Sequence, residues 1–135
     1  MIVTLHVATG AGAGAALGSR PAALACGPLL HLLGDRAPHT DIPSRRFELV
    51  TGTVAVLLLI ARRGPLDAAT IGAVAASIPD LEHVVRLPRP GGRKLFPSHR
   101  FGGWHRSGGL PASAQLLLAG AILGWVAALG RPSSQ

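Results

Sequence analysis

Residues 2–17 read IVTLHVATGAGAGAAL, and this stretch decides the expected fold class. It is rich in Ala, Gly and Leu and shows no alternation of apolar and polar residues, so the pattern predicts a helix rather than a strand. Gly10, Gly14 and Gly18 recur at every fourth position, and small residues at this spacing allow two helices to approach closely. His6 interrupts the apolar run, where an imidazole needs a partner.

Four further apolar runs share this composition: Pro21–Leu33, Phe47–Ala61, Ala68–Ile78 and Leu110–Leu129. We therefore predict an all-α fold, a bundle of about five helices in a single domain over residues 1–135. The last run has 20 residues without a charge, enough to cross a bilayer, so we expect the bundle to be membrane-embedded. The shorter runs also fit half-buried helices or the buried helices of a soluble bundle. Gly120 and Gly124 repeat the glycine spacing, which allows a homo-oligomer.

Composition narrows the range of partners. The 13 basic and 6 acidic residues give a net charge of +7, which suits anionic lipid, phosphate or nucleic acid. Tyr is absent and only three Phe occur, so an aromatic platform for bases is missing and we expect no nucleic-acid partner. Cys26 is the single cysteine, which excludes an intramolecular disulfide framework and a cysteine-based zinc finger.

Alternating helix directions would gather the charged residues on one side of the bundle. The N-terminus and the connections at residues 35–46 and 79–109 then share a side that holds nine of the 13 basic residues. The positive-inside rule places this side in the cytoplasm. We therefore expect a multi-pass protein of the cytoplasmic (inner) membrane, with its polar, motif-bearing connection at residues 79–109 facing the cytoplasm.

The same side receives all six histidines and five of the six acidic residues. His31-Leu-Leu-Gly-Asp35 places an imidazole and a carboxylate on one helical face, and Pro79-Asp80-Leu81-Glu82-His83 is a second dense cluster. The segment at residues 98–107 adds two His and two Arg. The candidate metal ligands are His6, His31, Asp35, Asp80, His83, His99 and His105. Imidazole and carboxylate ligands without cysteine suit a divalent metal, with zinc expected and manganese or iron as alternatives.

Three further residues are candidates for catalysis. Glu82 is a candidate base for a water molecule at the metal, and Arg100 and Arg106 are candidates for clamping a phosphate. Each motif also has a structural interpretation. The His–Asp pair fits a solvated helix end, and the acidic residues fit complements of a helix dipole. The arginine-rich segment fits a basic interfacial loop anchored by Trp104.

The order of these motifs resembles the small bacterial inner-membrane metal-dependent hydrolase family, which includes a LexA-regulated membrane protein and is distantly similar to zinc-dependent phospholipase C. The matching residues are His6, the segment Pro79-Asp80-Leu81-Glu82, the pair His99-Arg100, and His105, while His31 and Asp35 match a further His-Leu-Leu-x-Asp element. Glu82 stands where the family has a second Asp, and the spacing from His99 to His105 is one residue longer. The resemblance implies a metal site and hydrolysis.

We therefore expect a membrane-bound metal-dependent hydrolase acting on a phosphate ester or a lipid headgroup at the cytoplasmic interface. Its partners would be membrane lipid and a phosphate-containing molecule. The alternative is a non-enzymatic small membrane protein whose basic face, around Arg89, Arg93 and Lys94, binds anionic lipid or a partner protein. A metal transporter would need polar residues deeper within several helices.

Overall fold

The computed structural model describes residues 1–85, 87–104 and 106–130, and within them every regular element is helical, which confirms the all-α prediction. The elements are α1 (Val3–Leu17), α2 (Arg20–Arg36), α3 (Arg45–Arg63), α4 (Ala68–Ser77), the 3₁₀ turns η1 (Ile78–His83) and η2 (Pro90–Gly92), α5 (Pro97–Arg100) and α6 (Ala112–Ala128). The five long helices coincide with the five apolar runs. The short elements occupy the polar connection at residues 79–109, which gives that connection a defined shape.

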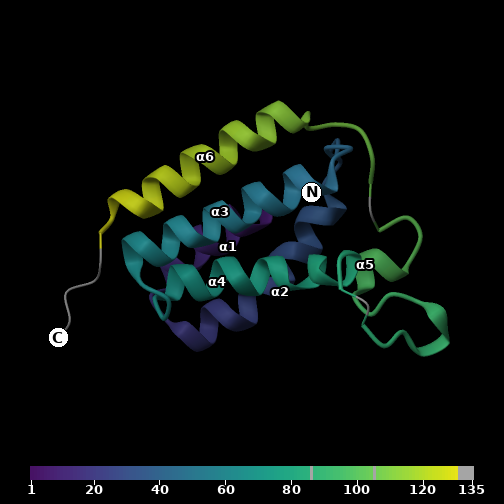
Figure 1. The fold of residues 1–135 in the computed structure, drawn as a ribbon, viewed down its shortest axis with the longest axis horizontal. Helices are drawn as coiled ribbons and strands as arrows, with labels where there is room; N and C mark the ends of the chain where they lie inside the picture. Colours follow the sequence, from purple (N-terminus) through teal and green to yellow (C-terminus); the bar gives the residue numbers. More distant parts are fainter. Residues whose placement is uncertain (86, 105, 131–135) are drawn as a thin grey trace.

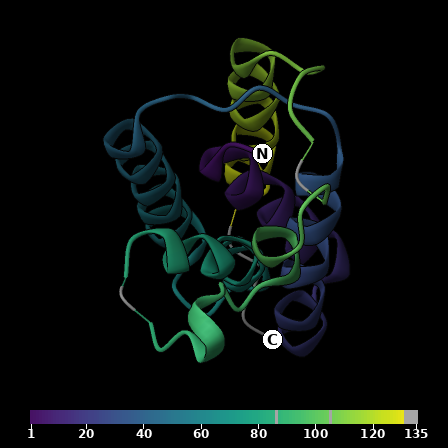
Figure 2. The same ribbon diagram turned by 90° about the vertical axis from the view of Figure 1, so that its right-hand side faces the viewer.

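Helix α1 lies at the centre of the bundle. The other four long helices all contact it, and the end-on view shows them arranged around it (Figures 1 and 2). Leu5, Val7, Ala8 and Ala11 of α1 are fully buried as a result. The N-terminus, η1 and α5 lie at the same end of the bundle (Figure 1). This end therefore collects the polar connections.

Glycines hold α1 against α4. A β-carbon added to Gly10 would lie 2.2 Å from the carbonyl oxygen of Gly72, and one added to Gly14 would lie 2.1 Å from that of Ala68. The glycine repeat of α1 therefore serves close packing within this chain. Around Gly120 no described atom lies within 4 Å of an added β-carbon, and the predicted homo-oligomer stays untested there.

Side-chain caps fix where the helices begin. The hydroxyl oxygens of Ser19 and Ser44 accept from backbone N–H groups in the first turns of α2 and α3. Asp67 caps α4 by accepting from the backbone N–H of Ala69 at 2.9 Å. The same carboxylate accepts from Nε of Arg63 at 2.9 Å, which ties the end of α3 to the start of α4. These turns produce the up-and-down order that the sequence suggested.

Backbone hydrogen bonds fasten the long polar connection to the segment after α2. The N–H of His39 donates to the carbonyl of Arg106 at 3.2 Å, and the N–H of Thr40 donates to that of Leu110 at 3.0 Å. The N–H of Leu110 returns a bond to the carbonyl of Pro38, also at 3.0 Å. These bonds hold the C-terminal end of the connection beside α2, and α5, within the connection, packs against α2.

The predicted membrane embedding is wrong. Among the described residues, no helix combines the length and the apolar character needed to span a bilayer. The uncharged run at Leu110–Leu129 is helical only over the 17 residues of α6, because Pro111 is its N-cap. These residues extend about 25 Å, against about 30 Å of hydrocarbon core. Helix α3 has 19 residues but carries charges in both end turns. The predicted multi-pass location in the cytoplasmic membrane is therefore wrong as well.

Candidate metal centre

Four elements deliver imidazole and carboxylate groups to the end of the bundle where α5 lies (Figure 1). His6 comes from α1, Asp80 from η1 and His99 from α5. Helix α2 supplies His31 and Asp35, which are both buried, and their spacing of four residues places them on one face. Two overlapping triads have ligand atoms within 4.8 Å of one another: His6 with His31 and Asp35, and His31 with Asp80 and His99.

The distances around His31 and His99 match those between ligands of a single ion. Their Nε2 atoms are 3.3 Å apart. These nitrogens lie 3.2 Å and 3.3 Å from Oδ2 of Asp35, and 3.8 Å and 3.7 Å from Oδ1 of Asp80. Tetrahedral coordination with bonds of about 2.0–2.1 Å separates neighbouring ligand atoms by about 3.3–3.4 Å. An ion between the two imidazoles would therefore lie within reach of both carboxylates.

Hydrogen bonds on the far side of each ring determine which nitrogen faces this point. Nδ1 of His31 donates to the carbonyl oxygen of Ala76 at 2.7 Å, and Nδ1 of His99 donates to Oε1 of Glu82 at 2.6 Å. Because both acceptors lack a hydrogen to donate, the proton of each neutral imidazole lies on Nδ1. The two Nε2 lone pairs are therefore directed toward each other and toward Asp35, as in metal sites.

Acceptors outnumber donors where these atoms meet. Two Nε2 lone pairs, Oδ2 of Asp35 and Oδ1 of Asp80 face the same point. The hydroxyl of Ser98 donates one hydrogen bond to Asp35 Oδ2 at 2.6 Å. Oδ2 of Asp80 is buried and has no hydrogen-bond partner in the described part of the chain. An arrangement of this kind is stabilised by a cation.

The protonation states suit such a cation. Burial raises the pKa of Asp35, but the facing imidazoles of His31, His6 and His99 outweigh it and hold that pKa well below its usual range. Burial also raises the pKa of Asp80, which keeps a net upward shift. Burial lowers the pKa of His99, but contacts with Asp35 and Glu82 outweigh it and raise that pKa overall. A proton on His99 is therefore the cation that competes with a metal ion.

His6 packs beneath this cluster. Its ring stacks on His31 with centroids 3.7 Å apart, and its Nε2 lies 3.1 Å from Oδ1 of Asp35. Burial lowers its pKa to about 3, so the ring is neutral near pH 7. The α-amino group of Met1 also donates to Asp35 Oδ1, at 2.9 Å. His6 therefore contacts Oδ1 of Asp35, the oxygen that does not face His31 and His99. Nδ1 of His6 is buried and has no hydrogen-bond partner among the described residues.

Glu82 lies behind His99 rather than in the open site. Its carboxylate accepts from Nδ1 of His99 at 2.6 Å and from the backbone N–H groups of Leu95 and Phe96 at 2.7 Å and 3.3 Å. Burial raises its pKa, but these bonds outweigh it and lower the pKa overall. The carboxylate is thus ionised and fully engaged. Its contacts fit a group that orients a metal-bound histidine.

His83 and the nearby cations form a layer outside His99. Nζ of Lys94 donates to Nδ1 of His83 at 2.9 Å, and the His83 ring packs edge-on against His99 with centroids 4.2 Å apart. Burial, followed by the charges of His99 and Lys94, lowers the pKa of His83 to about 4. Arg89 donates to the backbone carbonyl of Glu82 at 2.7 Å. His83 therefore belongs to neither ligand triad. Arg89 and Lys94, two cations of the expected basic face, are both hydrogen-bonded within the chain.

The side chains of the two arginines expected to clamp phosphate are not directed to the cavity, although the backbone N–H of Arg106 donates to the carbonyl of Asp35 at 3.4 Å. The Arg100 guanidinium stacks over Phe101 at 5.6 Å, and the Arg106 side chain is exposed. Neither residue lines the cavity beside the centre. His105, the remaining predicted ligand, lies outside the described residues.

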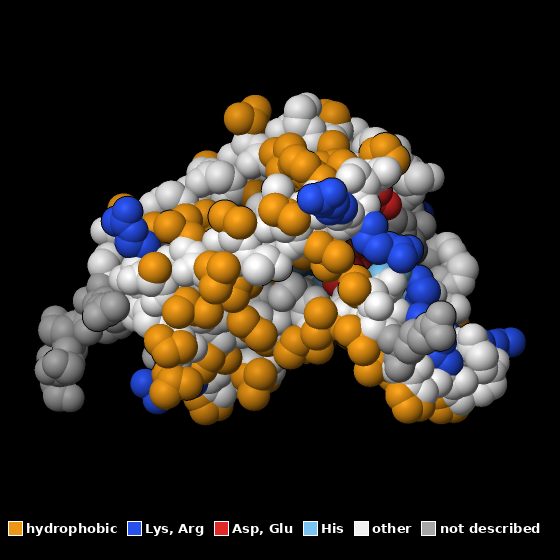
Figure 3. Space-filling model, viewed as in Figure 1, with side chains coloured by type: hydrophobic (Ala, Val, Ile, Leu, Met, Phe, Trp, Pro, Cys, Tyr) orange, Lys and Arg blue, Asp and Glu red, His pale blue; other side chains and the backbone are white. Residues whose placement is uncertain are grey.

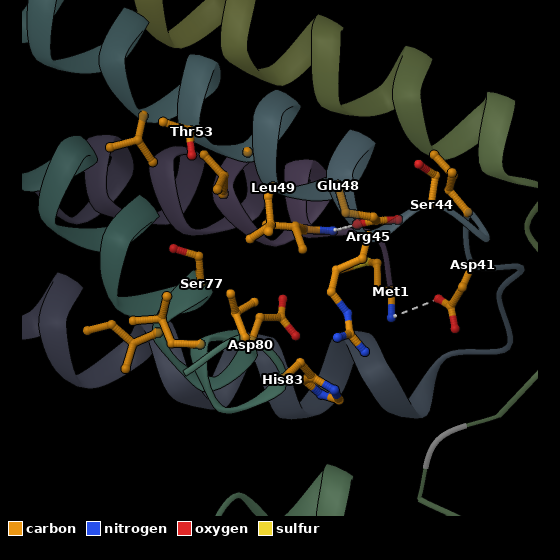
Figure 4. A pocket seen from close by; sticks show the side chains of 18 of the residues that line it. Met1, Asp41, Ser44, Arg45, Glu48, Leu49, Thr53, Ser77, Asp80 and His83 are labelled. Atoms are coloured by element: carbon orange, nitrogen blue, oxygen red, sulfur yellow. Dashed lines mark hydrogen bonds and ion pairs between the residues drawn. The ribbon is translucent and has the colours of Figure 1, made fainter. Parts of the chain in front are cut away.

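A cavity of about 900 Å³ opens beside the centre, between α1, α3, α4 and η1. Asp35, Asp80, His83 and His99 line one part of it, and Figure 4 shows Asp80, His83 and Arg45 around the opening. Figure 3 shows Lys and Arg side chains gathered at this end of the molecule, while hydrophobic side chains cover much of the remaining face. The centre is therefore reachable by a small molecule.

Sequence reasoning assigned no role to several residues that complete this site. Ser98 precedes His99 in the sequence, and that proximity is a usable signal for a hydroxyl beside a ligand. No feature of the sequence indicates that the carbonyl of Ala76 contacts His31, because only the packing of α4 on α2 brings the two together. For Arg45, the only indication in the sequence is that it is a cation within the polar connection at residues 35–46.

We found no match to the chain among protein-family models, curated proteins or solved structures. The expected family, hydrolase activity and preference for zinc thus gain no support from relatives. Function is therefore inferred from the geometry of the centre.

Proposed function

We propose that this chain is a metal-dependent hydrolase that cleaves a phosphate ester. The observation that carries the proposal is the placement of the Nε2 atoms of His31 and His99, which are 3.3 Å apart and face two carboxylates. The order of motifs, with its resemblance to the metal-dependent hydrolases named above, agrees with it. Kinship with that family remains part of the proposal.

The donor set fits one divalent ion. His31, His99, Asp35 and Asp80 would hold it, and His6 and Glu82 would keep Asp35 and His99 in place. Imidazole and carboxylate donors suit zinc, and also manganese or iron. When bound, such an ion supplies Lewis-acid polarisation of a phosphoryl oxygen and activation of a water nucleophile.

The reaction adds water across a P–O bond. The hydroxyl of water ends on phosphorus, and its hydrogen ends on the leaving oxygen. Buried Asp35, held by Ser98 and His6, stays ionised and fixes the position of the centre. Asp80 and His99 line the cavity wall and so meet the substrate side. The contacts of Glu82 favour positioning of His99 over the base role predicted from the sequence.

Metal analysis combined with an activity assay tests the proposal. The purified protein should retain about one equivalent of a divalent transition metal and hydrolyse bis(p-nitrophenyl) phosphate. His31→Ala and His99→Ala should lower both retention and rate by more than about 100-fold. Asp41→Asn is the matched control, because Asp41 lines the cavity but belongs to neither triad, and it should retain metal. Metal-free wild-type protein, with equal rates for wild type and His99→Ala, would contradict the proposal.

A further inference from the structure

The cavity beside the centre has two chemically different parts. Asp35, Asp80 and His99 form its polar end. Apolar side chains from four elements form the rest of the wall, among them Val7, Leu49, Val56, Val74, Ile78 and Leu81. A small polar substrate would leave this apolar wall in contact with water. The wall therefore favours a ligand that carries a hydrocarbon portion.

Arg45 marks the polar end with a positive charge. It is the only arginine among the described residues that line the cavity. In Figure 4 its side chain extends from α3 across the opening, and the guanidinium lies between Met1 and His83. The described part of the chain offers it no hydrogen bond or ion pair, whereas Arg63 and Arg89 are both engaged. This guanidinium is placed to take an anionic group at the centre.

The carboxylates at the opening do not cancel this preference. Glu48 is already engaged, because its Oε2 accepts from the backbone N–H of Val3 at 2.7 Å. Asp41 lies 3.0 Å from Nε2 of His39. A divalent ion at the centre would neutralise Asp35 and Asp80. The positive charge of Arg45 is then available to an anion.

We infer that the cavity binds a single-chain amphiphile with a phosphate head, placing the head between Arg45 and the metal centre and the alkyl chain along the apolar wall. This inference rests on the proposed function, because it assigns the substrate class of the same centre. Each methylene that enters the apolar part should tighten binding about fourfold, until the cavity is filled. Arg45 contributes to the head alone and should act equally on every chain length.

Calorimetric titration with non-hydrolysable alkylphosphonates tests the inference. Hexyl-, octyl- and decylphosphonate, each below its critical micelle concentration, are titrated into zinc-loaded protein, with inorganic phosphate as the head without a chain. Affinity should rise about 16-fold for every two methylenes. Arg45→Gln should weaken all members about 10-fold or more without changing the dependence on chain length. Equal affinity for inorganic phosphate and decylphosphonate would overturn the inference.

A wall variant separates the cavity from a general apolar surface. Val74 lines the cavity and is 39% exposed, so Val74→Phe should fold and should weaken decylphosphonate selectively. Val50→Phe is the matched control, because Val50 is 53% exposed on α3 but outside this cavity. Equal effects of the two variants would also overturn the inference. Because these titrations measure binding, chain-dependent affinity without turnover would reject only the hydrolase proposal, whereas turnover without chain dependence would reject only this inference.

Discussion

Replacing Glu82 by Gln should weaken metal binding without touching a ligand. The carboxylate accepts three hydrogen bonds, from Nδ1 of His99 at 2.6 Å and from the backbone N–H groups of Leu95 and Phe96 at 2.7 Å and 3.3 Å. A glutamine offers one carbonyl oxygen in place of two carboxylate oxygens, and its NH₂ group would face a donor. The negative charge that makes His99 a stronger ligand is lost as well.

The expected loss of metal affinity is about 10–100-fold, which corresponds to about 1.4–2.7 kcal/mol. The metal-free fold should lose about 1–3 kcal/mol, because one buried donor loses its partner. Calorimetric titration of the metal-free protein with Zn²⁺ measures the first quantity, and urea denaturation in the presence of a chelator measures the second.

Glu48→Gln is the control for this experiment. Glu48 also accepts from a backbone N–H, that of Val3 at 2.7 Å, but it belongs to neither ligand triad. Its substitution should change stability by a similar amount and leave the affinity for Zn²⁺ within about threefold of the wild type. If Glu82→Gln binds Zn²⁺ as tightly as the wild type, or if both variants lose affinity equally, the orienting role of Glu82 is refuted.

Three further predictions concern the fold. Gly14→Val should destabilise the protein by several kcal/mol in urea denaturation, because a β-carbon there would lie 2.1 Å from the carbonyl oxygen of Ala68. The control Gly120→Ala should be neutral or stabilising by up to about 1 kcal/mol, because no described atom lies within 4 Å of the added β-carbon. In metal-free protein the pKa of His6 is lowered from 6.5 to about 3, so between these pH values the unfolded state binds one proton more than the folded state. The free energy of unfolding should therefore rise with pH by up to about 1.4 kcal/mol per pH unit, and His6→Gln should remove this contribution. An unchanged slope in the variant would contradict the burial of His6 as a neutral ring. Asp67→Ala should lower the free energy of unfolding by about 3–5 kcal/mol, because it removes the cap of α4 and leaves the buried Arg63 side chain without its carboxylate partner. A loss below about 1 kcal/mol would show that the Arg63–Asp67 pair contributes little to stability.

The gathering of the polar residues at one end could be anticipated from the sequence. Helices that alternate in direction must return every second connection to the same end, so His6, Asp35 and Asp80 could be placed together without side-chain detail. The orientation of each imidazole could not be anticipated. It depends on the carbonyl of Ala76 and on Glu82, which only tertiary packing brings to His31 and His99.

The different positions of Asp80 and Glu82 follow from the 3₁₀ turn of η1. Three residues per turn place Asp80 and His83 on the same side, and both line the cavity. Glu82 then points elsewhere, toward the backbone of Leu95. The spacing of three residues between Asp80 and His83 predicts that they share a side of such a turn, but it does not predict that this side faces the cavity.

The membrane prediction was wrong because apolar composition does not identify what covers a helix. Helix α1 carries apolar residues on all sides, which suits its position among four other helices. The same pattern is typical of a helix in lipid. Its glycines, which resemble those of membrane helix pairs, pack against α4 instead. Helix length decided the question for α6.

The proposed metal centre requires that His31 and His99 direct their Nε2 atoms at one cation. Anomalous diffraction at the zinc absorption edge, from crystals grown with Zn²⁺, would locate that cation. We expect a single strong peak about 2.0–2.1 Å from both Nε2 atoms, with Asp35 and Asp80 as the neighbouring oxygen ligands. A map without a peak there, or with zinc bound only at exposed residues, would contradict the proposed centre.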